Sequence, residues 1–583
     1  MPTYDAVVIG SGFGGAVAAE RIAKAGKSVV VLERGPRWSL SNVQKTASRN
    51  ADGSLKPAAD GKYRFEHAHD PRYLYAGFKD YLAPNYLVAE TFGVGGGSNW
   101  YSNISERAPS RIFSGTPAWP TGWDYTRLSS LYDRVEGVYD TVTKTWTTPY
   151  KVYSYFPRPN EPRFNVLRYA IEQVAGPDSF VHARLAVRGG GHACYYASTS
   201  CTPCHSGIET PNPTGDYCQG RCRYCGFCTF GCVFGAKQSL MMNYIYRAEY
   251  FGAQIWPLKY VVRIENRPDG LYDVVYKDAT IGHFIDGVKA TGTTESRVTA
   301  KVVVLAGGAI STPTLLLQSK LAGFLTSISG QVGYNMSGTG DYATGLFLPS
   351  LFSIAFDGCT YSSTEAFKGR VMSGITRNLA ASDGVCIEDL WGPPVGVAAK
   401  FAIRLHDPSW ADSLSYWNST TNKVTKWKNP SLYGLRQKQM IEAYPKRAIG
   451  IAFMGEDGNN GRVSVGANGT VSLTRPTLTK YDTYQWWLNE IRKKLPAGTR
   501  FVETEHERRN GDFYASVHTL GTCRMAADIN SGVCSTNGQV FNYPNLYICD
   551  GSVIPRSTVV NPSWTILAVS EGICDYLVSH FPA

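Results

Sequence analysis

The 583-residue chain lacks several features that would place it in other functional classes. No apolar run approaches the roughly 18 residues that cross a membrane, so no integral membrane segment is expected. Lys and Arg form no run of five or more despite a net charge of +11, which argues against a nucleic-acid partner. The first β-run begins at Tyr4, so no signal peptide is expected in the chain as it stands. We therefore expect a cytoplasmic protein, or a secreted or periplasmic one if a leader was removed before residue 1.

Long repeats and low-complexity linkers are also absent, and 43% of the residues are hydrophobic, which is typical of a globular chain. The most informative segment is residues 4–35, where two β-runs flank a helical pattern. Gly10 suits the tight turn after the first strand, Gly12 allows a pyrophosphate to approach the backbone, and Gly15 allows the helix to pack on the strand. Glu33 lies 23 residues after Gly10, where a carboxylate can accept hydrogen bonds from the ribose hydroxyls. The segment predicts a dinucleotide site, and its N-terminal position favours FAD over NAD.

Three further segments predict parts of the same nucleotide-binding fold. Residues 91–107 form a glycine-rich run suited to wrapping a phosphate or an isoalloxazine ring. Residues 301–319 read as a strand, a glycine turn and a helix. Residues 545–554 read as a strand and a turn, followed by an amphipathic helix over about 564–579. Strand–turn–helix units that return to one sheet predict a discontinuous α/β domain.

The predicted fold is α/β, with a discontinuous FAD-binding Rossmann-like domain and an α+β substrate-binding domain that has an antiparallel sheet. The second domain contains residues 461–476, whose alternation around Asn468-Gly469 predicts a hairpin with a type I′ turn. The segments assigned to the FAD-binding domain are 1–110, 235–330 and 505–583. Those assigned to the substrate-binding domain are 111–234 and 331–504, with a Cys-rich segment at 194–232.

Several motifs together resemble the glucose-methanol-choline (GMC) family of FAD-dependent oxidoreductases. The run Gly95-Gly96-Gly97-Ser98 resembles the first family signature, and residues 308–316 resemble the second. The C-terminal segments VHTLGTCRM, NLYICDGSVIP and VVNPSWTILAVSEGI resemble the family's catalytic region. The cholesterol-oxidase-like branch is the most similar, because its histidine–asparagine pair matches His518 and Asn561. Residues 222–245 also resemble a segment of cholesterol-oxidase-like and long-chain alcohol oxidase sequences.

The resemblance implies FAD as the cofactor. Tyr101 stands where the first signature usually has Asn or His, so the covalent histidyl-flavin link of some members is not expected. The residues expected to contact FAD are Gly10, Gly12, Gly15, Glu33, Arg34, Gly95, Gly97, Ser98, Asn103, Val261, Ala306, Gly307, Asp550, Gly551, Asn561 and Pro562.

The resemblance also implies oxidation of an alcohol, with a hydride passing from the carbinol carbon to flavin N5. His518 is the expected base for the hydroxyl proton, because an ordinary histidine has a pKa of about 6.5. Asn561 cannot titrate, so we expect it to orient the hydroxyl. The implied substrate is bulky and largely apolar, such as a sterol or a long-chain alcohol, and oxygen is the expected acceptor.

The cysteines leave a second function open. Eight of the fourteen lie between Cys194 and Cys232, and the last four, Cys222, Cys225, Cys228 and Cys232, have ferredoxin-like spacing. An iron–sulfur cluster, a zinc site, and disulfides or simple thiols are all compatible with that spacing. A cluster would favour a dehydrogenase of a sugar-like alcohol that passes electrons to a quinone or cytochrome partner. No metal site is assigned from the sequence.

Overall fold

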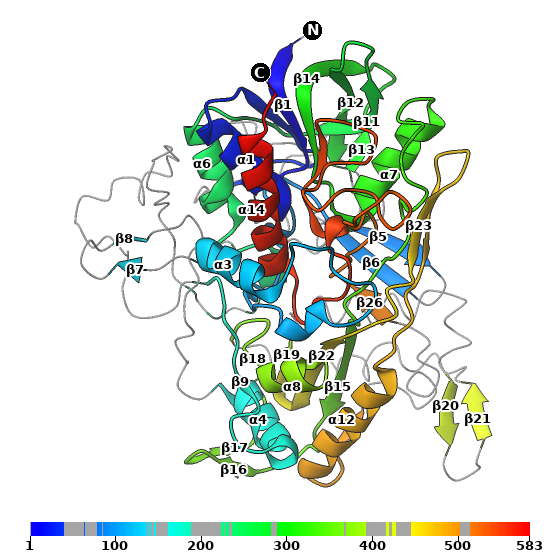
Figure 1. Ribbon diagram of the computed structural model, residues 1–583. Coiled ribbons are helices and arrows are strands. Elements are labelled where there is room, and N and C mark those ends of the chain that lie inside the picture. The colour runs from blue at the N-terminus through cyan, green and yellow to red at the C-terminus, as the bar shows by residue number, and fades with distance from the viewer. Residues whose placement is uncertain are drawn as a thin grey trace.

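The computed structural model forms two layered regions, one at the top and one at the bottom of the view in Figure 1. The upper region contains the N-terminal strand and the C-terminal helix, which lie far apart in the sequence. The structure describes residues 2–39, 63–64, 78–83, 86–136, 139–140, 145–146, 161–187, 222, 224, 226, 228–232, 236–281, 288–365, 369–391, 415–418, 423–426, 445–501 and 514–582.

The upper region is built on an eight-stranded sheet with the strand order β10-β2-β1-β14-β12-β11, in which β13 also pairs with β12 and β27 with β14. The first four strands and β27 are parallel, and β11, β12 and β13 run antiparallel to their neighbours. The last four residues of β1 and all four of β2 are aliphatic and buried, as expected for strands covered on both faces. The strands are β1 (Thr3–Ile9), β2 (Val29–Leu32), β10 (Gln254–Trp256), β11 (Lys259–Asn266), β12 (Tyr272–Ile281), β13 (Val288–Ala290), β14 (Ser296–Leu305) and β27 (Leu546–Ile548).

β14 changes its partner along its length. Residues 296–300 pair with β12, whereas residues 303–305 pair with β27 from the C-terminal part of the chain. The other edge of β14 pairs with β1 over Thr3–Ile9. The carboxyl ends of β1, β14 and β27 therefore lie side by side.

Helices α1 (Phe13–Lys24), α6 (Tyr244–Tyr250) and α14 (Ser563–Ser579) pack together beside this sheet (Figure 1). α7 (Gly308–Leu321) packs against β11, and α3 (Tyr125–Glu136) packs against α14. The approach of α1 requires a glycine, because a Cβ at Gly14 would overlap the carbonyl of Cys549. α14 confirms the helix predicted over about 564–579 to within one residue.

The lower region is built on a six-stranded sheet with the order β25-β15-β22-β19-β18-β9. All of its pairings are antiparallel. Helices α4 (Pro162–Ala175), α8 (Arg377–Ser382) and α12 (Tyr481–Lys494) lie beside it in Figure 1. Its strands are β9 (Val181–His182), β15 (Tyr342–Phe347), β18 (Gly374–Ile375), β19 (Val385–Leu390), β22 (Ala448–Gly455) and β25 (Arg500–Phe501).

The mixed α/β fold confirms the predicted fold class. The strands of the eight-stranded sheet come from residues 3–32, 254–305 and 546–548, and those of the six-stranded sheet from residues 181–182 and 342–501. The domain boundaries themselves stay a prediction. Among the described residues, no helix is both long enough and apolar enough to cross a bilayer.

The remaining strands form small sheets. β23 and β24 make the predicted hairpin, but its type I′ turn is wrong. That turn needs positive φ at two central residues, whereas Gly469 has φ +80° and Asn468 is not left-handed. The small sheets comprise β3 (Trp38–Ser39) with β4 (Tyr63–Arg64), β5 (Phe78–Ala83) with β6 (Tyr86–Thr91) and β26 (Tyr514–Ser516), β7 (Tyr139–Asp140) with β8 (Thr145–Trp146), β16 (Ile354–Phe356) with β17 (Cys359–Tyr361), β20 (Ser415–Asn418) with β21 (Lys423–Lys426), and β23 (Arg462–Val465) with β24 (Val471–Thr474).

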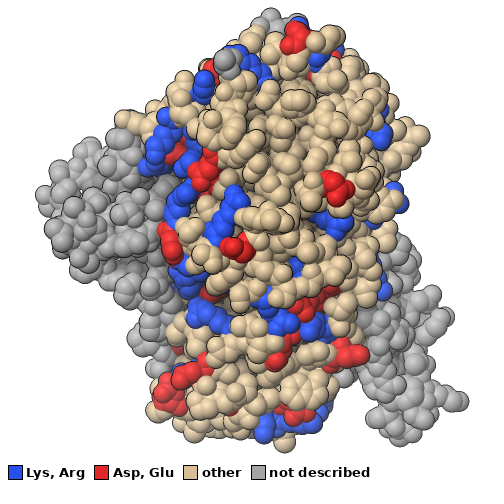
Figure 2. Space-filling view, in the orientation of Figure 1, with Lys and Arg blue, Asp and Glu red and all other residues tan. Residues whose placement is uncertain are grey.

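On the face shown in Figure 2, basic and acidic side chains of the described residues are interspersed. Ion pairs among the described residues include Arg134 with Asp575 (2.8 Å) and Arg107 with Glu136 (2.7 Å). Where residues are described, the face in Figure 2 shows no large patch of one sign.

Candidate active site

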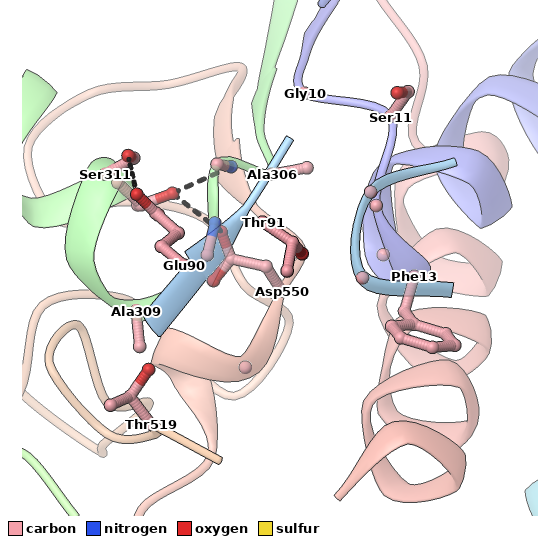
Figure 3. Close-up of a pocket in the computed structure, with 18 of the residues that line it drawn as sticks. Gly10, Ser11, Phe13, Glu90, Thr91, Ala306, Ala309, Ser311, Thr519 and Asp550 are labelled. Atoms are coloured by element: carbon pink, nitrogen blue, oxygen red, sulfur yellow. Dashed lines mark hydrogen bonds between the residues drawn. The ribbon is translucent and has the colours of Figure 1, made fainter. Parts of the chain in front are cut away.

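A cavity of about 860 Å³ opens at the carboxyl ends of the parallel strands. Its lining includes the residues that follow four of them: Gly10 after β1, Glu33 after β2, Ala306 after β14 and Asp550 near the end of β27. Ligands of open α/β sheets bind at this edge. In Figure 3 the turn at Gly10, Ser11 and Phe13 faces Ala306 and Asp550 across an open space.

The N-terminal glycine turn is shaped by close backbone contacts. Gly10 has φ +95°, and a Cβ there would lie 2.5 Å from the carbonyl oxygen of Ala306. A Cβ on Gly15 would overlap the carbonyl oxygen of Gly10. A Cβ on Gly12, in contrast, would meet no atom within 4 Å, although Gly12 lines the cavity. No side chain caps α1, so its N-terminal N–H groups can bind an anion.

Glu33 joins three loops at the cavity wall. One carboxylate oxygen accepts hydrogen bonds from the backbone N–H (3.1 Å) and hydroxyl (2.7 Å) of Ser11. The other accepts hydrogen bonds from the N–H groups of Gly35 (2.8 Å) and Gly93 (3.1 Å). Glu33 therefore fixes the glycine turn at residues 10–11 relative to the first signature loop, residues 93–98. Glu33 also lines the cavity.

The opposite wall is fixed by Asp550 and the first turn of α7. One oxygen of Asp550 accepts hydrogen bonds from the N–H of Gly308 (2.8 Å) and the hydroxyl of Thr312 (2.6 Å). The other accepts hydrogen bonds from the N–H and hydroxyl of Ser552 (2.8 and 2.5 Å). Burial raises the pKa of Asp550, and these donors act against that shift. Figure 3 shows Ser311 bonded to Glu90 on the same wall.

His518 and Asn561 meet at the cavity from two different segments. His518 follows β26, and Asn561 immediately precedes the Pro562 N-cap of α14. The side-chain nitrogen of Asn561 lies 3.4 Å from Nε2 of His518, and Nδ1 of His518 lies 2.8 Å from a carboxylate oxygen of Asp341. Oδ1 of Asn561 is buried without a hydrogen-bond partner in the protein. A neutral imidazole in this setting can accept a proton from a hydroxyl group, which a carboxamide can orient.

Two family models match the chain, both described as GMC oxidoreductase, at residues 4–337 and 478–570. The chain belongs to the GMC oxidoreductase family. It is therefore an FAD-dependent oxidoreductase that acts on alcohols, as the motifs predicted.

Relatives place this GMC oxidoreductase near the cholesterol-oxidase-like branch. A cholesterol oxidase of Mycobacterium tuberculosis is 25% identical over 98% of this chain and 90% of the relative. A cholesterol oxidase of Acinetobacter baumannii is 24% identical over 98% and 94% of the two chains. A long-chain-alcohol oxidase of Arabidopsis thaliana is 23% identical over 98% of this chain and 67% of its own length.

Solved structures confirm the fold of the GMC chain. Pyridoxine 4-oxidase from Mesorbium loti superposes with a TM-score of 0.60 at 13% identity, covering 99% of both chains. A fungal aryl-alcohol oxidase superposes with a TM-score of 0.53 at 15% identity, also over 99% of both chains.

Most of the residues predicted to contact FAD surround the cavity of this GMC protein. Gly15, Gly95, Ser98 and Asn103 are not in its lining. The hydroxyl of Ser98 donates to the carbonyl of Gly95 (2.6 Å) and accepts from the N–H of Leu240 (2.9 Å), which closes the signature loop. The predicted residues that line the cavity are Gly10, Gly12, Glu33, Arg34, Gly97, Val261, Ala306, Gly307, His518, Asp550, Gly551, Asn561 and Pro562.

The cavity fits an FAD molecule on two counts. The uncapped end of α1 and the open space beside Gly12 provide room and N–H donors for a pyrophosphate. One buried side-chain oxygen of the lining, Oδ1 of Asn561, has no hydrogen-bond partner in the protein. Buried polar atoms are normally satisfied, so this oxygen can accept a hydrogen bond from a polar cofactor or substrate.

Two carboxylates near His518 were not found from the sequence. Asp341 bonds its imidazole, and Glu388 on β19 is fully buried, with neither oxygen hydrogen-bonded. Burial and the charges of Glu106 and Asp389 raise the pKa of Glu388 well above its ordinary value. In the sequence, a carboxylate just before or within an apolar strand is only a weak indication of a functional site, because the residue it contacts lies in a distant segment.

The cysteines predicted as cluster candidates are described only in part. Cys222, Cys228 and Cys232 are free thiols, so a disulfide between any two of them is wrong. Cys225 lies outside the described residues, as do Cys194, Cys201, Cys204 and Cys218. Within the described residues, no group of three or more Cys, His, Asp or Glu could hold a metal ion. The iron–sulfur and zinc interpretations stay predictions.

Proposed function

We propose that this GMC oxidoreductase oxidises a bulky, largely apolar alcohol, such as a sterol or a long-chain alcohol, with His518 as the base. The observation that carries the proposal is the pair formed by His518 and Asn561 at the cavity wall, with 3.4 Å between Nε2 and the amide nitrogen. Nε2 would accept the hydroxyl proton, and Asn561 would orient the hydroxyl oxygen. FAD held in the cavity would supply the acceptor for the hydride of the carbinol carbon, with oxygen as the proposed final electron acceptor.

Two observations support the apolar substrate. Apolar side chains of Met372, Val471 and Val517, which lie outside the eight-stranded sheet, line the same cavity as His518. The relatives include proteins named cholesterol oxidase and long-chain-alcohol oxidase. A small polar alcohol would leave these apolar side chains in contact with water, which costs roughly 25 cal/mol for each Å² of apolar surface left exposed.

We also propose that FAD is held without a covalent bond. Among the described lining residues, His518 is the sole histidine, and there is no cysteine. Tyr101 at the signature position donates its hydroxyl to the carbonyl of Gln238 (3.2 Å). Precipitation of the holoprotein with acid should release the flavin into the supernatant.

The test is anaerobic mixing of the holoprotein with cholesterol, with a long-chain primary alcohol and with glucose. We expect the first or second to bleach the flavin absorbance, and the admission of air to restore it with one hydrogen peroxide formed per alcohol oxidised. Bleaching by glucose alone, or reduced flavin that air does not reoxidise, would contradict the proposal. The second result would favour the dehydrogenase alternative.

A further inference from the structure

Asp341 is placed where it can control the base. It immediately precedes β15 of the six-stranded sheet, and 8% of its surface is exposed. Its Oδ1 lies 2.8 Å from Nδ1 of His518, a residue 177 positions further along the chain. The contact therefore joins the six-stranded sheet to the segment that carries the base.

The carboxylate of Asp341 is held in one orientation. Its Oδ2 accepts hydrogen bonds from the hydroxyl of Ser516 (3.0 Å) and the N–H of Val517 (3.1 Å), which leaves Oδ1 for the imidazole. The backbone of His518 is fixed as well. Its N–H donates to Ser516 Oγ (3.1 Å), and its carbonyl accepts from the hydroxyl of Thr339 (2.9 Å).

This geometry selects one tautomer of the imidazole. An ionised carboxylate can only accept, so the proton of a neutral ring lies on Nδ1. The lone pair of Nε2 then faces the amide nitrogen of Asn561, which can only donate. Both neighbours therefore favour the same tautomer, the one in which Nε2 can receive a proton.

We propose that Asp341 is the positioning residue for His518, holding the proton on Nδ1 so that Nε2 carries the lone pair that accepts the hydroxyl proton. The tautomer itself depends only on the geometry, whereas its use in catalysis rests on the proposed function. When Nε2 takes the hydroxyl proton, the imidazolium faces the carboxylate of Asp341, which stabilises the new positive charge. This proton, with the hydride removed from the carbinol carbon, balances the reduction of oxygen to hydrogen peroxide.

The decisive measurement is nitrogen NMR of the holoprotein with ¹⁵N-labelled histidine, in mildly alkaline buffer where ordinary histidines are neutral. The chain has ten histidines, so His518→Ala identifies the signal by its disappearance. We expect a protonated Nδ1 and an unprotonated Nε2 in the wild type. Asp341→Asn should shift the ring towards the Nε2-protonated form, because an amide can present its own N–H to Nδ1.

Asp273→Asn is the matched control. Asp273 is similarly buried, with 6% exposed, and accepts a hydrogen bond from Thr299 (2.6 Å) on the eight-stranded sheet, away from His518. This variant should leave the His518 signals unchanged. A wild-type ring protonated at Nε2, or signals that Asp341→Asn leaves unmoved, would overturn the proposal. The wild-type spectrum decides this even if Asp341→Asn fails to fold.

A kinetic measurement separates this proposal from the proposed function. Asp341→Asn should slow flavin reduction at saturating alcohol by roughly 10²-fold with little change in KM or FAD content, and Asp341→Glu should recover part of the rate. Loss of FAD or a purely KM effect would contradict the positioning role. If no alcohol reduces the wild-type flavin, the proposed function fails, and the NMR result still decides the role of Asp341.

Discussion

Gly96 lies directly against Gly12: a Cβ built on Gly96 would come within 2.6 Å of the Cα of Gly12. The first signature loop therefore closes over the N-terminal glycine turn, although the two are far apart in the sequence. On its other side Gly12 borders open space in the cavity. The close contact depends on the absence of a side chain at Gly96, whereas a side chain at Gly12 would enter the cavity.

Gly12→Val should abolish FAD binding while the protein still folds. Gly12 has φ −70° and ψ −166°, which valine adopts readily, and a Cβ there meets no protein atom. The isopropyl group would instead occupy the path of the pyrophosphate. Gly330→Val is the control, because Gly330 also has free space and is exposed. Flavin content and circular dichroism of both variants check this, and normal flavin content in Gly12→Val would refute it.

His518→Ala should retain FAD but slow flavin reduction by roughly 10²–10⁴-fold, the usual contribution of a positioned general base. His580→Ala, at an exposed histidine beyond the end of α14, should react at the wild-type rate. Asn561→Ala should cost less than His518→Ala, because it removes orientation without removing the proton acceptor. Single-turnover reduction in a stopped-flow instrument measures all three, and a near-normal rate for His518→Ala would remove it from the mechanism.

Glu388→Gln should change the free energy of unfolding by less than about 1 kcal/mol, because burial raises the pKa of this carboxyl and so favours its neutral form, which an amide resembles. Asp389→Asn, at the next residue of the same strand, should cost about 3–5 kcal/mol. Asp389 lies 2.7 Å from the buried guanidinium of Arg163 and accepts hydrogen bonds from the N–H groups of Ser373 and Gly374. Urea unfolding of both variants is the measurement. Equal losses would mean that Glu388 is ionised in the folded protein.

Lys237 should make stability depend on pH. Its buried ammonium donates to the carbonyls of Asn99 (2.9 Å) and Cys228 (2.8 Å), and burial lowers its pKa from 10.5 to about 7. Because the folded-state pKa is below the unfolded one, the stabilisation is complete above pH 10.5 and is lost as the pH falls through about 7. Between pH 7.5 and 9, the wild type should gain about 2 kcal/mol relative to Lys237→Met.

The measurement for Lys237 is urea unfolding of the holoprotein at both pH values. Lys493→Met is the control, because Lys493 is 58% exposed on α12 and pairs only with Glu490 among the described ionic contacts. This control should follow the wild type at both pH values. Parallel pH dependence of the wild type and Lys237→Met would show that the buried amine stays charged throughout the range.

Replacing Cys222, Cys228 and Cys232 together by serine should leave the rates of flavin reduction and of dye reduction within about threefold of the wild-type rates. The three are free thiols, and burial raises the pKa of Cys222 to about 11, so this thiol is protonated in the metal-free protein. A bound metal would deprotonate the thiols that hold it, and the triple variant would then lose it. Stoichiometric iron and acid-labile sulfide in anaerobically purified wild type, lost in the triple variant, would establish the cluster-linked dehydrogenase instead.

The local parts of the nucleotide site could be predicted because they depend on short-range rules. The turn at Gly10, the helix after it and the helix over 564–579 follow from glycine spacing and apolar periodicity, and the structure has α1 and α14 there. The hairpin at 461–476 was also predictable, but its turn type was not. An Asn-Gly pair suits a type I′ turn, in which both residues are left-handed, and equally a turn in which only the glycine is left-handed, as Gly469 is here.

The sequence by itself determined the family, the cofactor, and the pairing of a histidine with an asparagine, because these depend on motifs that stay contiguous. Only the tertiary structure decided which groups surround that pair. Asp341 reaches His518 because β15 and β26 meet. Glu388 on β19 is fully buried, and neither of its carboxylate oxygens has a hydrogen-bond partner. Contacts such as that of Asp341 with His518 join residues more than a hundred positions apart, and their energies depend on burial and direction, which no local pattern encodes.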